Sequence, residues 1–127
     1  MKKNKKKYLN ISIKSSFFCT ISINLVHIIS TNILNISFNE INYLSITCSS
    51  ILLCFTGTGL YLLIRKSKYP NSSFHLIIAS LSLLNSCIII NNTPLIKFNQ
   101  LIIIIHSATA ILIMTFIPYL TNKSIIE

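Results

Sequence analysis

Two histidines are the residues of this chain best suited to chemistry. His27 lies in the stretch NLVHIIS and His106 in LIIIIHSATAILI, so both imidazoles have mostly apolar or small neighbours. A neutral imidazole can bind a metal through one ring nitrogen while a hydrogen bond orients the other nitrogen. Two such rings can ligate a b-type haem from both sides. His27 and His106 are therefore candidate ligands for a haem or another metal.

Other reactive groups are scarce in this sequence. It contains no Asp, and both glutamates, Glu40 and Glu127, lie outside the long apolar runs. A carboxylate pair for acid–base work cannot be built, and a hydrolytic triad would lack its acid. There is no Gly-rich phosphate loop and no C-x-x-C motif. The four cysteines fall inside apolar runs, where thiols behave as small apolar groups: Cys19, Cys48, Cys54 and Cys87. The sequence indicates no specific reaction and favours a non-catalytic protein.

The composition indicates a membrane protein. The chain has 127 residues, of which 52% are hydrophobic and only 10% charged, whereas a soluble domain has roughly a quarter charged residues. A bilayer removes the need for a charged surface. Ile, Asn and Lys are abundant while Gly, Ala and Arg are scarce, which suggests an AT-rich genome. We therefore expect a bacterial inner membrane or an organellar membrane.

Charged residues separate four long apolar runs. Each run reaches the ~20 residues that a helix needs to cross a hydrocarbon core of about 30 Å. Helix is expected because backbone amides in lipid must be satisfied within their own segment, and stretches such as LIIIIHSATAILIMTFI lack the alternation of a barrel strand. The fold class that follows is an all-α membrane protein with four transmembrane helices. The expected spans cover residues 15–36, 42–64, 74–92 and 98–120.

The first span is the least apolar of the four. It follows the segment MKKNKKK, so it could also be a signal peptide with a basic start. No small-x-small cleavage site follows it, and we expect an uncleaved helix. The chain then comprises a basic tail at 1–14, a single transmembrane domain at 15–122 and a short C-terminal tail at 123–127.

The positive charges predict how the four spans are oriented. The basic tail, the loop near residues 65–73 and the C-terminal tail share one side and carry ten of the eleven Lys and Arg residues. These ten are Lys2, Lys3, Lys5, Lys6, Lys7, Lys14, Arg65, Lys66, Lys68 and Lys123. The other side carries only Lys97, together with Glu40. By the positive-inside rule, both termini are expected on the cytoplasmic side or its organellar equivalent.

The net charge of +9 also needs an interpretation. Clustered lysines can bind phosphates of nucleic acid in a salt-dependent way. Topology and attraction to anionic lipid already account for a basic segment beside a membrane span. We expect the lipid bilayer as a partner and no nucleic acid.

The only two glycines, Gly57 and Gly59, lie in CFTGTGLYLL of the second span. A glycine lets a neighbouring helix or a flat ligand approach the backbone. Two residues apart, they point about 200° from each other and do not form a GxxxG face. Helix packing is the expected role, and a notch for a cofactor is the alternative.

The two deep histidines are expected at similar depth. His27 precedes the outer end of the first span, near Ile36, by roughly 13 Å, and His106 follows the start of the fourth, near Phe98, by roughly 12 Å. Side chains of this kind normally face the interior of a helix bundle. The candidates to orient the rings are Asn24, Asn85 and Ser107. In the alternative, each ring hydrogen-bonds a neighbouring helix, or contacts another subunit or a quinone. His75, at the start of the third span, needs no special role.

Three functions follow from these features. The first is a non-catalytic subunit or an assembly factor of a larger membrane complex, because reactive groups and large loops are lacking. The second is a small electron-transfer protein, linked to quinone or holding haem b between His27 and His106. The third is a small channel or transporter, for which only a weakly polar path of amides and hydroxyls is available.

Overall fold

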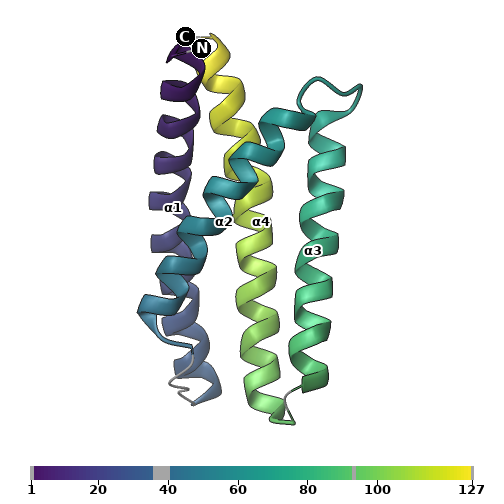
Figure 1. Ribbon diagram of the computed structural model, residues 1–127. Helices are drawn as coiled ribbons and strands as arrows, with labels where there is room; N and C mark the ends of the chain where they lie inside the picture. Colours follow the sequence, from purple (N-terminus) through teal and green to yellow (C-terminus); the bar gives the residue numbers. More distant parts are fainter. Residues whose placement is uncertain (1, 36–40, 93, 127) are drawn as a thin grey trace.

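The computed structural model describes residues 2–35, 41–92 and 94–126 (Figure 1). They form four helices: α1 (Lys2–Leu34), α2 (Tyr43–Ile64), α3 (Pro70–Asn92) and α4 (Ile96–Ile126). Within these ranges no residue belongs to a strand. All four helices are long and apolar enough to cross a membrane. The expectation of an all-α protein with four candidate transmembrane helices is confirmed.

Local sequence explains where the helices begin and end. Asn42 caps α2 through its side chain, which accepts a hydrogen bond from the Ser45 backbone N–H, while the Ser45 hydroxyl accepts one from the Asn42 N–H. Pro70 opens α3, where its missing N–H is not needed. Asn35 adopts a left-handed φ of 54° directly after α1, a common way to end a helix. α1 already begins at Lys2, so residues of the expected basic tail continue the first helix.

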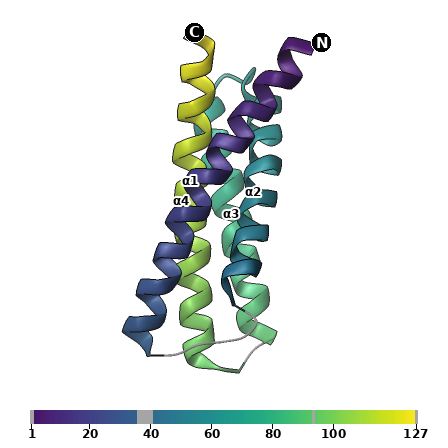
Figure 2. The ribbon, with the colours of Figure 1, turned by 90° about the vertical axis from the view of Figure 1, so that its left-hand side faces the viewer.

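The helices form an antiparallel bundle with one inclined member. α1 packs against α2 and α4, and α3 packs against α4 and α2, whereas α1 and α3 have no contact among the described residues. Figure 1 shows α2 crossing diagonally from α1 toward α3. Figures 1 and 2 both place the start of α1 and the end of α4 at the same end of the bundle.

Two apolar clusters form the interior. The first takes residues from all four helices: Cys19, Cys54, Tyr61, Phe74, Ile113 and Ile117. The second takes its buried members from α1, α4, the start of α2 and Ile41, two residues before α2. They are Ile23, Ile41, Ile46, Leu101, Ile102 and Ile105. Phe74 is the buried residue that α3 contributes. In the far half of α3, the partly buried Ile89 packs against the second cluster.

The buried face of α1 is made of small and polar residues. Its buried side chains include Ser12, Ser15, Ser16, Cys19 and Ser30. α2 meets it with residues of the same kind at helical spacing, namely Ser50, Cys54 and Thr58. In a membrane, where lipid is as apolar as leucine, small side chains hold helices together by letting their backbones approach. This explains why α1 and α2 pack along much of their length.

The two glycines of α2 face different surroundings. A Cβ added to Gly57 would lie 2.9 Å from Cδ1 of Ile117 and 3.3 Å from Cγ2 of Ile113. A Cβ added to Gly59 would meet only the Tyr8 ring, at 3.8 Å. Gly57 is therefore the position where α4 needs the space that a missing side chain leaves.

We expect Gly57→Ala to destabilise the bundle by about 1 kcal/mol relative to Gly59→Ala, because overpacking a core outweighs the better helix propensity of alanine. Gly59→Ala serves as the matched control and should be neutral or slightly stabilising. Unfolding of the purified protein by SDS in mixed micelles, followed by circular dichroism, measures both. Equal effects of the two substitutions would show that α4 does not press on Gly57.

Candidate functional site

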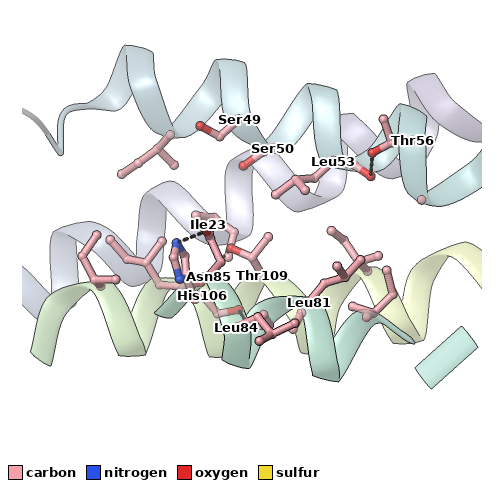
Figure 3. A pocket seen from close by; sticks show the side chains of 18 of the residues that line it. Ile23, Ser49, Ser50, Leu53, Thr56, Leu81, Leu84, Asn85, His106 and Thr109 are labelled. Carbon is pink, nitrogen blue, oxygen red and sulfur yellow. Dashed lines mark hydrogen bonds between the residues drawn. The ribbon is translucent and has the colours of Figure 1, made fainter. Parts of the chain in front are cut away.

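A groove lies between α2 and α3. Its volume is about 840 Å³, and α4 forms its floor (Figure 3). Such a volume lies within the ~300–1,000 Å³ of typical ligand sites. Most of its lining is apolar. The polar residues that line it are Ser45, Ser49, Ser50, Thr56, Ser82, Asn85, His106 and Thr109.

The inclination of α2 opens this groove. The first half of α2 follows α1, held there by small residues, and is separated from α3 (Figure 1). Toward its end, α2 approaches α3, where Tyr61 packs edge-on against Phe74 with ring centroids 5.1 Å apart. The Tyr61 hydroxyl also donates a hydrogen bond to Oδ1 of Asn71 at 2.5 Å. The two helices thus form a wedge that is closed at one end.

His106 connects the floor of the groove to α3. Its Nδ1 lies 2.9 Å from the Ser86 hydroxyl. Its Nε2 lies 3.5 Å from the amide nitrogen of Asn85 (Figure 3). With the ring proton on Nδ1, the ring donates to Ser86 and accepts from Asn85. The Ser82 hydroxyl donates to the backbone carbonyl of His106 at 3.2 Å. These contacts add polar attachments to the half of α3 in which Ile89 packs against the second cluster.

His27 has different neighbours. Its ring is buried and meets the Tyr43 ring edge-on, with centroids 5.3 Å apart, where α2 begins. Within the described residues its Nδ1 has no hydrogen-bond partner. His27 thus faces the start of α2, whereas the His106 ring faces α3. Ligation of a haem or metal by both rings stays a prediction. No group of three or more His, Cys, Asp or Glu side chains suited to a metal occurs in the described part of the chain.

Of the three residues expected to orient the histidine rings, only one contacts a histidine among the described residues. Asn85 contacts His106. The amide of Asn24 instead donates to the carbonyl of Thr20 at 2.9 Å and to the hydroxyl of Thr47 at 3.3 Å, and so joins α1 to α2. Ser107 is exposed. Sequence reasoning missed Ser82 and Ser86, because serines are frequent in the third span and none of them stands out.

His75 has a specific structural partner that the sequence analysis also missed. Pro118 lies inside α4 and has no N–H, so the carbonyl of Met114, four residues earlier, loses its usual helical partner. Nε2 of His75 lies 3.1 Å from this carbonyl oxygen. A ring N–H on α3 thus satisfies a backbone group that proline has freed on α4. Pro118 was the available signal, although it identifies the freed acceptor and not its donor.

This pairing predicts a coupled effect. His75→Phe should weaken the contact between α3 and α4 by about 0.6–1.7 kcal/mol, the range measured for side-chain hydrogen bonds in membrane proteins. In a Pro118→Ala background, the N–H of residue 118 can bond the Met114 carbonyl, and His75→Phe should then have almost no effect. SDS unfolding of the four proteins in the cycle gives the coupling. Additive effects would exclude the proposed link between His75 and Pro118.

Comparison with protein-family models, curated proteins and solved structures finds no match to this chain.

Proposed function

We propose that this chain is a non-catalytic subunit or assembly factor of a larger membrane complex, and that a transmembrane helix of a partner protein docks in the groove between α2 and α3. The observation that carries the proposal is Asn85, whose amide is exposed at this groove in the middle of α3, between the apolar groove residues Leu84 and Ile88. Within the described residues, the hydrogen-bonding contact of the Asn85 side chain is the 3.5 Å approach to His106. An amide in this position gains from a hydrogen-bonding partner when lipid surrounds it.

The shape of the groove supports a helix as the occupant. Its α2 wall extends from Ser45 to Leu60, a rise of roughly 22 Å at 1.5 Å per residue. That is most of the thickness of a hydrocarbon core of about 30 Å. The hydroxyls of Ser49 and Thr56 along this wall bond carbonyls of their own helix at 2.6 Å and 2.9 Å. They still offer acceptor lone pairs to a polar side chain on a neighbouring helix.

The sparse packing of α3 supports the same proposal. Phe74 is its buried residue, and large apolar side chains such as Leu76, Leu83 and Ile88 are more than half exposed. Four thin helices without large loops have little interior of their own in which to hold a substrate. A partner helix on α3 would cover the face of this helix that its contacts with α4 and α2 leave exposed.

We also propose the orientation of the protein in its membrane. The start of α1, the end of α4 and the connection between α2 and α3 lie at the same end of the bundle (Figure 1). The sequence of these segments carries most of the Lys and Arg residues. The positive-inside rule then favours a cytoplasmic-type side for this end, in a bacterial inner membrane or an organellar membrane.

A photocrosslinker tests the docking. We expect benzoylphenylalanine at Leu53 or Leu84, two exposed residues of the groove, to form one discrete protein adduct in native membranes. Mass spectrometry should locate the crosslink in a transmembrane segment of a different protein. The control position is Leu25 on α1, which is similarly exposed but does not line the groove. It should give lipid adducts only.

Asn85→Leu should reduce the adduct from Leu84 several-fold, because a side-chain hydrogen bond between helices contributes about 1–2 kcal/mol in model peptides. Lipid adducts alone at both groove positions would contradict docking. An adduct of twice the chain's mass would replace the proposed partner by a second copy of this chain.

One observation favours a second candidate function. His106 lies in the groove with its ring oriented by Ser86, as the imidazole of a haem or quinone site would be. Electron transfer through haem b or quinone therefore remains the alternative to docking, and His27 remains the second ligand that it would require.

A further inference from the structure

Two of the four cysteines form a pair in the centre of the bundle. Cys19 on α1 and Cys54 on α2 are fully buried, and their thiols lie close enough to interact with each other. Both belong to the apolar cluster to which all four helices contribute. Cys48 and Cys87, in contrast, are exposed. In the sequence, all four cysteines look like equivalent small apolar residues. In the structure, Cys19 and Cys54 form a buried pair, whereas Cys48 and Cys87 are exposed single thiols.

Contacts on both sides of the pair fix its register independently of the thiols. On one side, the Asn24 amide donates to the Thr47 hydroxyl at 3.3 Å. On the other, the Tyr8 hydroxyl donates to the carbonyl of Phe55 at 2.9 Å, and the two rings meet edge-on with centroids 6.3 Å apart. α1 and α2 are thus joined above and below Cys19 and Cys54. Neither helix can slide by one turn without losing these bonds.

The surroundings of the pair favour an uncharged product. The buried hydrophobic residues around it are Tyr61, Phe74, Ile113 and Ile117, and the uncharged hydroxyls of Ser15 and Ser16 lie beside the Cys54 thiol. A metal ion held by two thiolates alone has only two ligands, and with a monovalent ion the complex keeps a net negative charge that is costly to bury here. A disulfide carries no charge and no N–H or O–H group. It fits an apolar interior as the two thiols do.

We propose that Cys19 and Cys54 are a redox-active pair that closes reversibly to a disulfide between α1 and α2. In this step both S–H bonds break and one S–S bond forms. The two electrons and two protons pass to an oxidant, which must be an uncharged, lipid-soluble two-electron acceptor to reach a buried pair. A dithiol reductant reverses the step by returning two electrons and two protons.

The bond would act on the neighbouring groove. Ser50 and Gly57, which flank Cys54 at about one helical turn on either side, line this groove. A disulfide fixes the position of α2 on α1, and α2 is one wall of the groove. Oxidation of the pair therefore sets how far that wall can move. The pair itself does not depend on the proposed docking of a partner helix.

Diamide, a membrane-permeant oxidant whose N=N bond takes up two hydrogens, tests the proposal on the full chain in membranes. The variant Cys48→Ser/Cys87→Ser keeps only the buried pair. After oxidation, denaturation in the presence of a reagent that blocks free thiols, and then reduction, we expect maleimide-PEG to add two labels to each monomer of this variant. Without diamide it should add none. Dithiothreitol given before blocking should abolish the labels.

The matched control moves one thiol by one turn. In the same background, Cys54→Ser/Ser50→Cys keeps two thiols on the two helices, and its intramolecular disulfide should form at least about tenfold more slowly, because disulfide geometry tolerates little displacement. No labels in the variant that keeps the native pair would overturn the proposal, provided that an exposed control thiol pair in the same membranes is oxidised. Equal rates for the native and displaced pairs would also overturn it, since they would indicate mobile helices.

Discussion

Replacing Phe74 with alanine is expected to release α3 from the bundle. The Phe74 side chain is fully buried and packs against the Tyr61 ring, and it is the anchor that α3 places in the apolar interior. A buried Phe→Ala change costs about 3–5 kcal/mol in soluble proteins. Lipid is as apolar as the protein interior, so the cavity and the lost contacts dominate here. We therefore expect about 3 kcal/mol, a factor of about 100 in the equilibrium of opening.

The buried thiols report this opening. Cys19 and Cys54 belong to the same cluster as Phe74. The background Cys48→Ser/Cys87→Ser leaves only these two thiols. In this background, a small membrane-permeant methanethiosulfonate should label them on the order of 100-fold faster after Phe74→Ala, because the packing that protects them is lost. The control is Leu76→Ala on the same helix, where the side chain is 70% exposed. That variant should keep the slow rate. Similar labelling of both variants would show that Phe74 does not anchor α3.

Moving the positive charge should invert the protein in its membrane. Neutralising the cations of the first segment and of the connection between the second and third helices removes nine of the ten that favour one side. They are Lys2, Lys3, Lys5, Lys6, Lys7, Lys14, Arg65, Lys66 and Lys68. With lysines added near Lys97 as well, the bias reverses. Because Lys and Arg in short loops set orientation, we expect most molecules to place both ends on the opposite face.

The inversion is measured with two kinds of reporter, fused to either terminus. One reporter is active only in the cytoplasm, and the other is active only on the far side of the membrane. The unaltered chain should activate the cytoplasmic reporter from either terminus. A variant with arginine in place of each of these lysines is the matched control and should keep the original orientation. Termini found on opposite faces of the membrane would refute an even number of spans and the proposed orientation together.

The sequence predicts the four helices well because their formation is a local matter. Apolar runs of sufficient length need no distant partner to become helical in lipid, where each backbone amide must bond within its own segment. The start of α2 also depends on nearby residues, since the structure shows a capping box of Asn42 and Ser45 within four residues. The structure agrees with these expectations, and all four helices have the length and hydropathy of membrane spans.

The surroundings of individual side chains were not predictable in the same way. Axial rise gives the depth of a residue, but the direction of its side chain depends on how each helix is rotated and inclined among its neighbours. The depths expected for His27 and His106 are similar, yet the structure turns His27 to Tyr43 and His106 to Ser86. Gly57 and Gly59 look equivalent in sequence, and only Gly57 is pressed by α4.

The sequence by itself therefore determined the number and type of the elements and the distribution of charge between their ends. Only the tertiary structure decided which residues meet: His75 with the carbonyl that Pro118 frees, Cys19 with Cys54, and α2 with α3 at one end of a groove. The physical reason is that helix formation in an apolar solvent depends on neighbours along the chain. Contact between helices depends on how well the side chains of two whole helix faces fit together. The small residues that join α1 to α2 therefore decide the arrangement more than two single histidines do.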